Sequence, residues 1–469
     1  MKRRVGGEGI VEGTEARTMG WATGGGDEAI YKGRGIRTVG GMRRRIPLIV
    51  AGVATGIALT WGAARISNAW SFLPNRELNR ASDQVKDVLR LVNEHYVEAE
   101  EVSYGELAKA ALHGMVTSLD PHSDFLEAED MDDLEEQLSG NFSGVGIQVE
   151  IRDGRVLVIA PIANSPAERA GVERGDEILG VDGKGFDQGV TVDEIVDRLR
   201  GRPRSNVTMD LLRAREGKRF QVTLQRETIE LESVRAVEVL SGKTGYILLS
   251  EFTDHTARDF GRALERLEKE GVDSLIIDLR NNPGGLLESA VAVAEPFFER
   301  GEEIVSTRGR KPEDTTIYRS QREGRARRWR MAVLINGNTA SAAEVLTGAL
   351  KDTQRAIVVG ERSYGKGSVQ TIFPLGTGDG VRLTTARYFT PSGVSIHGTG
   401  IAPQVEVALN DDEKSKLTVQ LARTDVSDPH EFKERFGFEP MEDRQLQAAL
   451  QVLRGAEIMA TRSRVISRR

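Results

Sequence analysis

The sequence contains no cysteine among its 469 residues. This absence excludes cysteine nucleophiles, zinc sites built on cysteine, and disulfide bonds. Histidine is also scarce, with six in the chain, and none of them follows an H-x-x-x-H or H-E-x-x-H spacing. Paired histidines at such a spacing are typical of zinc sites on a helix. We therefore predict neither a metal ion nor another cofactor.

The chain also lacks a basic stripe interleaved with aromatic residues, the pattern that is typical of nucleic-acid-binding surfaces. Its formal net charge is −7, so we expect no nucleic-acid partner. Hydrophobic residues make up 39% and charged residues 29% of the chain, as in ordinary soluble globular proteins. A chain of this length has room for about two to four domains.

The first 41 residues are rich in glycine and polar side chains and have no apolar periodicity, which predicts disorder. Met42 and three arginines then precede an apolar stretch over 46–64. Met42 begins a more ordinary membrane-targeting signal than Met1 does. Residues 1–41 are therefore a candidate for sequence that is not translated.

The basic cluster and apolar stretch predict a signal peptide or a membrane anchor over 42–69. The positive end should stay cytoplasmic, so the rest of the chain should lie on the periplasmic side of the cell envelope. We favour a single N-terminal anchor in the inner membrane, and cleavage near Ala64 or Ala69 is the alternative.

Residues 70–139 read as a helical region. Apolar residues recur at helical spacing over 77–98 and 104–119, and a short acidic helix is expected over 130–138. The second helix should stop before Pro121, because proline disfavours a helical predecessor. We interpret the region as a packing or dimerisation element, which leaves a homo-oligomer open.

The pattern changes near residue 140. A glycine loop leads into alternating residues over 142–151, and Asp153-Gly154 is a hairpin signal. The run S-P-A-E-R-A-G-V-E-R-G-D-E-I-L-G-V-D-G begins at Ser165, and an amphipathic helix is expected over 191–200. The length and order of these segments resemble those of a PDZ domain, and the resemblance covers residues 140–228.

The PDZ resemblance implies that a peptide's C-terminal carboxylate binds in the glycine loop while the peptide adds a strand to the sheet. Small residues there let several backbone N–H groups converge on an anion. The alternative is that the apolar residues expected in this groove only form the core of the domain. The expected groove residues are Gly144, Val145, Gly146, Ile147, Val149, Ile195, Val196 and Leu199.

Residues 229–409 alternate strands with helices, which predicts an α/β core. Ser341 follows an apolar strand over 331–335, and Lys366 follows another over 356–359. A serine hydroxyl needs a neighbouring base, and a lysine can serve only when burial keeps its amine neutral. The pair therefore predicts a serine–lysine hydrolase.

Two further segments fit acyl transfer. Gly284 and Gly285 follow a strand, and with the N–H of Ala342 they could form an oxyanion hole. A glycine pair after a strand, taken alone, is more often only a turn. Gln370 follows Lys366 by four residues on an alternating segment, so we expect both on one strand face. Its amide could then hold the lysine amine towards Ser341.

The segment from Gly360 to Lys366 nearly matches a phosphate-binding loop, but Gly367 stands where serine or threonine is required. Such a loop must also open a helix, whereas the residues that follow alternate like a strand. We therefore disfavour nucleotide binding.

Three motifs, N-T-A-S-A-A-E, G-E-R-S-Y-G-K-G-S-V-Q and D-L-R-N-N-P-G-G-L, together resemble the carboxyl-terminal processing peptidases, or tail-specific proteases. The segment from Gly114 to Ser123 resembles that family's N-terminal signature, and the likeness covers about residues 78–408. The implied residues are Ser341 as nucleophile, Lys366 as general base, Gln370 as third member, Gly284, Gly285 and Ala342 at the oxyanion hole, and Glu344 in support.

The prediction is a multi-domain α/β protein, with a helical arm, a PDZ domain, a protease core and a helical tail over 410–469. Its function would be a serine endopeptidase that grips protein substrates by unstructured C-terminal tails. A helix-capping role and a salt bridge are equally open for Glu344. A PDZ scaffold with an inert core is the competing interpretation.

Overall fold

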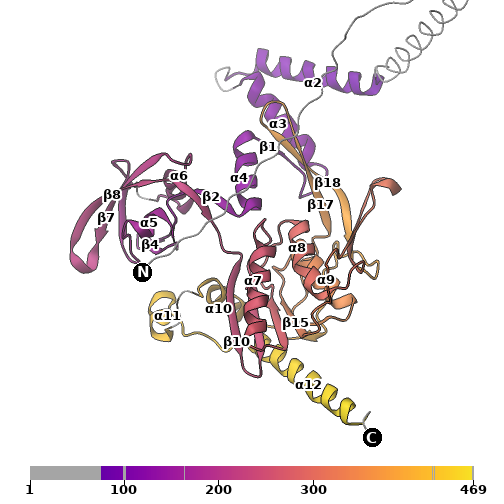
Figure 1. Ribbon diagram of the computed structural model, residues 1–469. Coiled ribbons are helices and arrows are strands. Elements are labelled where there is room, and N and C mark those ends of the chain that lie inside the picture. Colours follow the sequence, from indigo (N-terminus) through magenta and orange to yellow (C-terminus); the bar gives the residue numbers. More distant parts are fainter. Residues whose placement is uncertain are drawn as a thin grey trace, which may run out of the picture. The chain divides into compact units, whose positions relative to one another are not determined.

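The computed structural model (Figure 1) describes residues 75–98, 102–162, 164–187, 189–424, 426 and 428–466, with side chains up to 458. The disorder expected over 1–41 and the signal or anchor expected over 42–69 lie outside these residues. Among the described helices, none is long and apolar enough to cross a membrane. The chain divides into two compact units, Met1–Glu94 and His95–Arg469.

The first unit contributes most of one described helix, α2 (Arg76–His95), where the sequence predicted a helix over 77–98. None of its residues is buried. Leu78, Val85, Val88 and Leu91 are all exposed by half or more.

The second unit begins with α3 (Tyr104–Thr117), β1 (Asp124–Leu126) and α4 (Ala128–Ser139). The Ser103 hydroxyl caps α3 by accepting the Glu106 N–H at 3.1 Å. The sequence predicted only helices here, but β1 pairs antiparallel with a strand of the α/β core. The chain after Pro121 therefore returns to the core.

The PDZ domain is built on a six-stranded sheet with two short helices. Its core consists of inward residues that alternate along the strands, such as Val207, Met209 and Leu211, all fully buried. A separate pair, β2 (Asn141–Gly144) and β9 (Glu227–Glu230), joins the two ends of the domain. The domain's other elements are β3 (Ile147–Arg152), β4 (Arg155–Pro161), α5 (Pro166–Arg169), β5 (Glu177–Val181), β6 (Lys184–Gly185), α6 (Val192–Leu199), β7 (Asn206–Arg213) and β8 (Lys218–Gln225).

The α/β core contains a six-stranded sheet in the order β10-β11-β12-β15-β16-β19. Neighbours from β11 onward are parallel, and β10 is antiparallel at the edge. Strand β12 is buried along its whole length, as expected for a parallel strand covered on both faces. The strands are β10 (Val234–Leu240), β11 (Thr244–Leu249), β12 (Ser274–Asp278), β15 (Arg330–Ile335), β16 (Ala356–Gly360) and β19 (Val405–Glu406).

Helices cover both faces of this sheet (Figure 1). On one face, α7 (Thr256–Lys269), α8 (Leu287–Ala294) and α9 (Ala342–Asp352) bury the main hydrophobic core. On the other, α12 (Arg444–Ile466) packs Leu450 and Leu453 against the sheet. The layers follow from the sequence, because strands of continuous apolar residues need cover on both sides.

A second sheet carries β1 and the long hairpin of β17 (Ser368–Pro374) and β18 (Gly380–Phe389). Strand β1 pairs with β18 at Asp124↔Arg382, and β13 pairs with β18 on its other edge. The remaining elements are β13 (Glu303–Gly309), β14 (Thr316–Arg319), α10 (Asp411–Ala422), α11 (Pro429–Phe436) and the single turns Ala214–Glu216, Glu295–Phe297 and Pro312–Asp314.

A buried ion network fastens the start of α12 to the sheet. The fully buried Arg280 guanidinium donates to Asp278 at 2.5 Å and to Asp443 at 2.7 Å. The Tyr246 hydroxyl donates to the same Asp278 carboxylate at 2.8 Å. Removing one partner of such a buried pair leaves an uncompensated charge. The network therefore also anchors the loop that follows Arg280, which carries Gly284.

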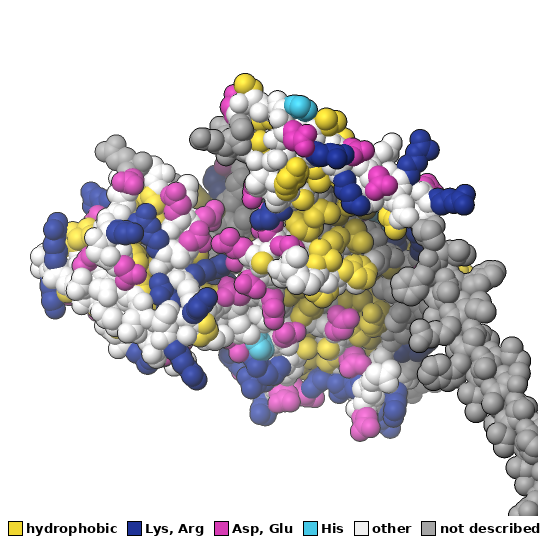
Figure 2. Space-filling view, turned by 90° about the horizontal axis from the view of Figure 1, so that it is seen from above, with side chains coloured by type: hydrophobic (Ala, Val, Ile, Leu, Met, Phe, Trp, Pro, Cys, Tyr) yellow, Lys and Arg dark blue, Asp and Glu magenta, His cyan; other side chains and the backbone are white. Residues whose placement is uncertain are grey.

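One face of the molecule carries a field of hydrophobic side chains bordered by acidic ones (Figure 2). Large exposed hydrophobic residues of the second unit include Met115 and Leu119 near the end of α3, and Phe373 and Leu375 at the end of β17.

Candidate active site

Ser341 lies on a sharp turn between β15 and α9. Its φ of 54° and ψ of −120° are sparsely populated by residues with side chains. The turn needs Gly284 beside it, because a Cβ there would lie 2.8 Å from the Ser341 Cβ. Ser341 is buried, and it occupies a strained strand-to-helix turn like that of a nucleophile elbow, although the sequence around it has no G-x-S-x-G motif.

The Glu344 carboxylate ties Ser341 to the loop of Lys366. Its Oε2 atom accepts the backbone N–H of Ser341 at 2.9 Å and that of Lys366 at 2.8 Å. The two backbone nitrogens share this acceptor, so they lie no farther apart than the sum of these two lengths. The other oxygen, Oε1, accepts the Ser363 hydroxyl at 2.5 Å and the Gly365 N–H at 2.7 Å.

Glu344 belongs to the first turn of α9, and its carboxylate also binds the loop that carries Lys366. The sequence left a helix cap and a salt bridge open for Glu344. Its side chain does cap α9, and among the described residues it forms no ion pair. Burial raises the pKa of its carboxyl, and the hydrogen bonds from Ser363, Gly365, Ser341 and Lys366 oppose that rise.

Lys366 lies at the tip of a tight turn in which the Gly367 N–H donates to the Gly365 carbonyl at 3.1 Å. Both glycines are required: Gly365 has a φ of 94°, and a Cβ on Gly367 would lie 2.4 Å from the His397 nitrogen. Strand β17 begins only at Ser368. The expectation that Lys366 shares a strand face with Gln370 is therefore wrong.

The Lys366 side chain is half-buried. Burial lowers the pKa of its amine, and the positive charge of Arg382 lowers it further. Both effects favour the neutral amine that a general base requires. Within the described part of the chain, Nζ forms no hydrogen bond to Ser341 or Gln370.

Gln370 lies at a bulge in the β17–β18 pairing, opposite Thr384. Its amide donates to the Ser368 hydroxyl at 2.9 Å and to the Thr384 hydroxyl at 3.4 Å. Gln370 and Ser368 therefore share a face, as expected for alternate residues. The strand that follows Lys366 also excludes a phosphate-binding loop, which would open a helix.

Two backbone N–H groups near Ser341 are available to a ligand in the part of the chain that the structure describes. Gly284 donates its N–H to the Asn282 side chain at 2.9 Å, so that group is already used. In contrast, neither the Gly285 N–H nor the Ala342 N–H meets an acceptor among the described residues. Ala342 is the first residue of α9, where the helix dipole favours negative charge.

Sequence reasoning did not single out Tyr388. Burial raises the pKa of its phenol to about 12, against an opposing interaction with the Ser341 side chain. Its backbone N–H donates to the Gly367 carbonyl at 2.8 Å, so β18 also holds the lysine loop. Nothing in its local sequence marks it, because this role depends on the pairing of distant segments.

Six of the eight predicted groove residues line one cavity of the PDZ domain: Gly144, Val145, Gly146, Ile147, Val196 and Leu199. Ile195 is instead fully buried in the domain core, and Val149 packs against that core. Phe142 and Arg200, which the sequence did not suggest, line the same cavity. The Arg200 guanidinium lies over the Phe142 ring at 5.8 Å from its centroid.

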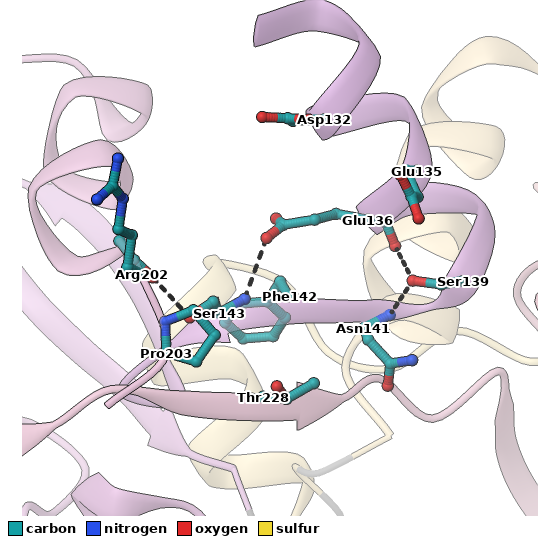
Figure 3. Close-up of a pocket in the computed structure, with 11 residues that line it drawn as sticks. Asp132, Glu135, Glu136, Ser139, Asn141, Phe142, Ser143, Arg202, Pro203 and Thr228 are labelled. Carbon is teal, nitrogen blue, oxygen red and sulfur yellow. Dashed lines mark hydrogen bonds between the residues drawn. The ribbon is translucent and has the colours of Figure 1, made fainter. Parts of the chain in front are cut away.

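A larger cavity of about 480 Å³ adjoins it and shares Phe142 (Figure 3). Asp132, Glu135 and Glu136 of α4 form one wall, and Arg202 and Pro203 form another. The structure describes no group of three or more histidines or carboxylates placed to hold a metal ion.

Comparison with known proteins identifies the family of both domains. Residues 243–407 match the model of peptidase family S41, and residues 157–226 match that of the PDZ domain. The "Carboxy-terminal-processing protease" of Bartonella bacilliformis is 37% identical over 88% of this chain and 96% of its own length. "Carboxy-terminal processing protease CtpB" of Bacillus subtilis is 32% identical over 78% and 77%, respectively.

Among solved structures, the chain is similar to "Photosystem II D1 C-terminal processing protease", with 31% identity, 69% and 92% coverage, and a TM-score of 0.40. Fold and site define a serine-type peptidase that carries a PDZ domain. The chain belongs to the carboxy-terminal processing proteases of peptidase family S41. The predicted family, fold class and enzyme type are thereby confirmed.

Proposed function

We propose that Ser341 is the nucleophile and Lys366 the general base of a dyad that cleaves peptide bonds. The observation that carries this proposal is the single Glu344 oxygen that accepts the backbone N–H groups of both residues. The lowered pKa of the Lys366 amine adds support, because only a neutral amine can take the proton of Ser341. Glu344 then acts as a positioning residue for both partners.

The reaction follows from these roles. Lys366 takes the Ser341 proton while Oγ attacks the substrate carbonyl, and the Gly285 and Ala342 N–H groups stabilise the oxyanion. Gly284 allows the close approach, since any side chain there would contact Ser341. The protonated amine then passes its proton to the leaving amine, and water hydrolyses the acyl-enzyme. Gln370, as the third member, holds the amine towards Ser341.

The Lys366 side chain moves to reach Ser341 in this mechanism. The two backbones are already tethered through Glu344, so rotation of the flexible lysine side chain closes the dyad. Movement of the PDZ domain on substrate binding would gate this step.

The PDZ cavity supports recognition of a C-terminal tail. Gly144 and Gly146 lie at the glycine loop, where backbone N–H groups can face a carboxylate. Val196 and Leu199 supply an apolar surface for a side chain of the tail. The Arg200 guanidinium, now 3.7 Å from Asp133 and 3.8 Å from Glu136, would exchange these partners for the tail carboxylate. The partners are thus proteins with unstructured C-termini.

Location, assembly and domain limits are part of the same proposal. The basic and apolar segment over 42–69 supports a single membrane anchor with the catalytic domains on the periplasmic side. The exposed apolar face of α2 supports self-association. The domain limits at residues 140, 229 and 410 follow the changes in sequence pattern.

A model protein with an unstructured C-terminal tail tests the proposal. Ser341→Ala and Lys366→Ala should each abolish the cleavage seen by mass spectrometry. Lys416→Ala, which removes a half-buried lysine paired with Asp412, should cleave like the wild type. Arg200→Ala should weaken tail recognition and leave the cleavage position unchanged. Cleavage at the wild-type rate by Lys366→Ala would contradict the dyad.

A further inference from the structure

We propose that Asp120 and Thr384 are positioning residues that fix the orientation of the Gln370 amide, so that its carbonyl oxygen is the group available to the Lys366 amine. This inference rests on the proposed role of Gln370. It gives a function to the N-terminal segment around Pro121, which the mechanism has not otherwise used.

Asp120 is the centre of a tight turn. Its carboxylate accepts the backbone N–H groups of His122 at 2.8 Å and Ser123 at 3.1 Å, and the Ser123 hydroxyl at 2.7 Å. A fourth bond comes from the Thr384 hydroxyl of β18, at 3.1 Å. Burial raises the pKa of this carboxyl, but the hydrogen bonds outweigh burial and hold the pKa below its ordinary value. Asp120 is therefore ionised at neutral pH and can only accept.

The ionised Asp120 carboxylate determines which group donates in the hydrogen bonds that link Thr384, Gln370 and Ser368. A threonine hydroxyl has one proton, and that of Thr384 is donated to Asp120. Its oxygen can then only accept, so the group facing it at 3.4 Å must be the Gln370 NH₂. The same NH₂ donates to the Ser368 hydroxyl at 2.9 Å. Both amide hydrogens are used, and the carbonyl oxygen remains as an acceptor.

Two further hydrogen bonds hold the Asp120 turn against β18. The Thr384 N–H donates to the Ser123 hydroxyl at 3.0 Å, and the Arg382 guanidinium donates to the His122 carbonyl at 3.1 Å. Strand β1 continues this pairing. Arg382 is also the residue whose charge lowers the pKa of Lys366. One short segment thus holds two groups that act on the lysine amine.

Loss of the Thr384 hydroxyl should release the Gln370 amide, which could then turn its NH₂ towards the lysine amine. A neutral hydrogen bond of ordinary strength corresponds to about a tenfold change in rate when it acts only in the transition state. Gln370 is not assigned to tail binding, so the loss should fall on kcat and leave KM unchanged.

The test uses the full chain and the tailed model protein. Thr384→Val should lower kcat by about tenfold with KM unchanged, and Thr384→Ser should restore it. Thr385→Val is the matched control, because Thr385 is equally half-buried and adjacent on β18, and among the described residues its hydroxyl is paired only with that of Thr371. It should match the wild type.

Asp120→Ala provides a second variant should Thr384→Val not fold. It removes the acceptor of the Thr384 hydroxyl, which can then donate to the Gln370 carbonyl and turn the amide, so kcat should fall by a similar factor. An unchanged kcat in the folded variants, or an equal loss in Thr385→Val, would overturn this inference while Ser341→Ala remains inactive. Cleavage that survives in Ser341→Ala would instead overturn the proposed function, and this inference with it.

Discussion

Replacing Glu344 by glutamine should weaken the hydrogen bonds that tether the nucleophile to the base without changing the size of the side chain. The carboxylate accepts four hydrogen bonds, from Ser341, Ser363, Gly365 and Lys366. Glutamine has only one acceptor oxygen. Its NH₂ must therefore face donors at one of the two positions that the carboxylate oxygens now occupy.

The two orientations differ in what they leave unpaired. At the Oε2 position the NH₂ would face the N–H groups of both Ser341 and Lys366, whereas at Oε1 it would face Gly365 and a hydroxyl that can accept. The orientation with the NH₂ at Oε1 is less unfavourable, because it leaves only the Gly365 N–H unpaired, at a cost of about 1–3 kcal/mol. The three remaining bonds lose their charge. Since the buried charge is also removed, we expect a net destabilisation of about 2–3 kcal/mol.

Activity should fall further than stability suggests, because the bonds that weaken hold the reacting groups together. We expect kcat/KM to fall by about 100-fold, equivalent to about 2.7 kcal/mol. Cleavage of the tailed model protein and urea denaturation of the same samples measure the two effects. Glu361→Gln, a half-buried carboxylate paired with Lys414, is the control. Wild-type activity in Glu344→Gln would refute the reasoning.

Two further predictions concern the base and the oxyanion hole. The rate of cleavage should fall with falling pH as the Lys366 amine becomes protonated. Arg382→Gln should move this fall to higher pH, because the positive charge of Arg382 lowers the pKa of the amine. A pH–rate profile that does not move in Arg382→Gln would count against Lys366 as the base. Gly284→Ala should lower kcat by about 10²-fold, since its Cβ would lie 2.9 Å from the Ala342 nitrogen and its φ of 106° is strained. Gly437→Ala, with a φ of 78° and open space around it, carries strain alone and should keep its activity.

The positions of Ser341 and Lys366 could be predicted because their strands are local features. Strands β12, β15 and β16 are continuous apolar runs, and both residues follow the carboxyl ends of adjacent strands. Parallel strands end at the same edge of a sheet, so the two loops had to lie near each other. The glycine loop after β12 reaches the same edge for the same reason.

The remaining parts of the site depend on contacts between distant segments. The turn at Lys366 is set by His397, about 30 residues later, which leaves no room for a side chain at Gly367. The pairing of β1 with β18 joins Asp120 to Thr384 across more than 260 residues. Neither contact leaves a periodic signal in the sequence. Alternation therefore predicted a longer strand β17 and missed β1.

The most direct test of the central claim is covalent labelling of Ser341 by a fluorophosphonate, which reacts with activated serine hydroxyls. Peptide mapping by mass spectrometry should find the adduct on the peptide that carries Ser341 in the wild type and not in Lys366→Ala. Equal labelling of Ser341 in both proteins, or an adduct on another serine alone, would contradict the account.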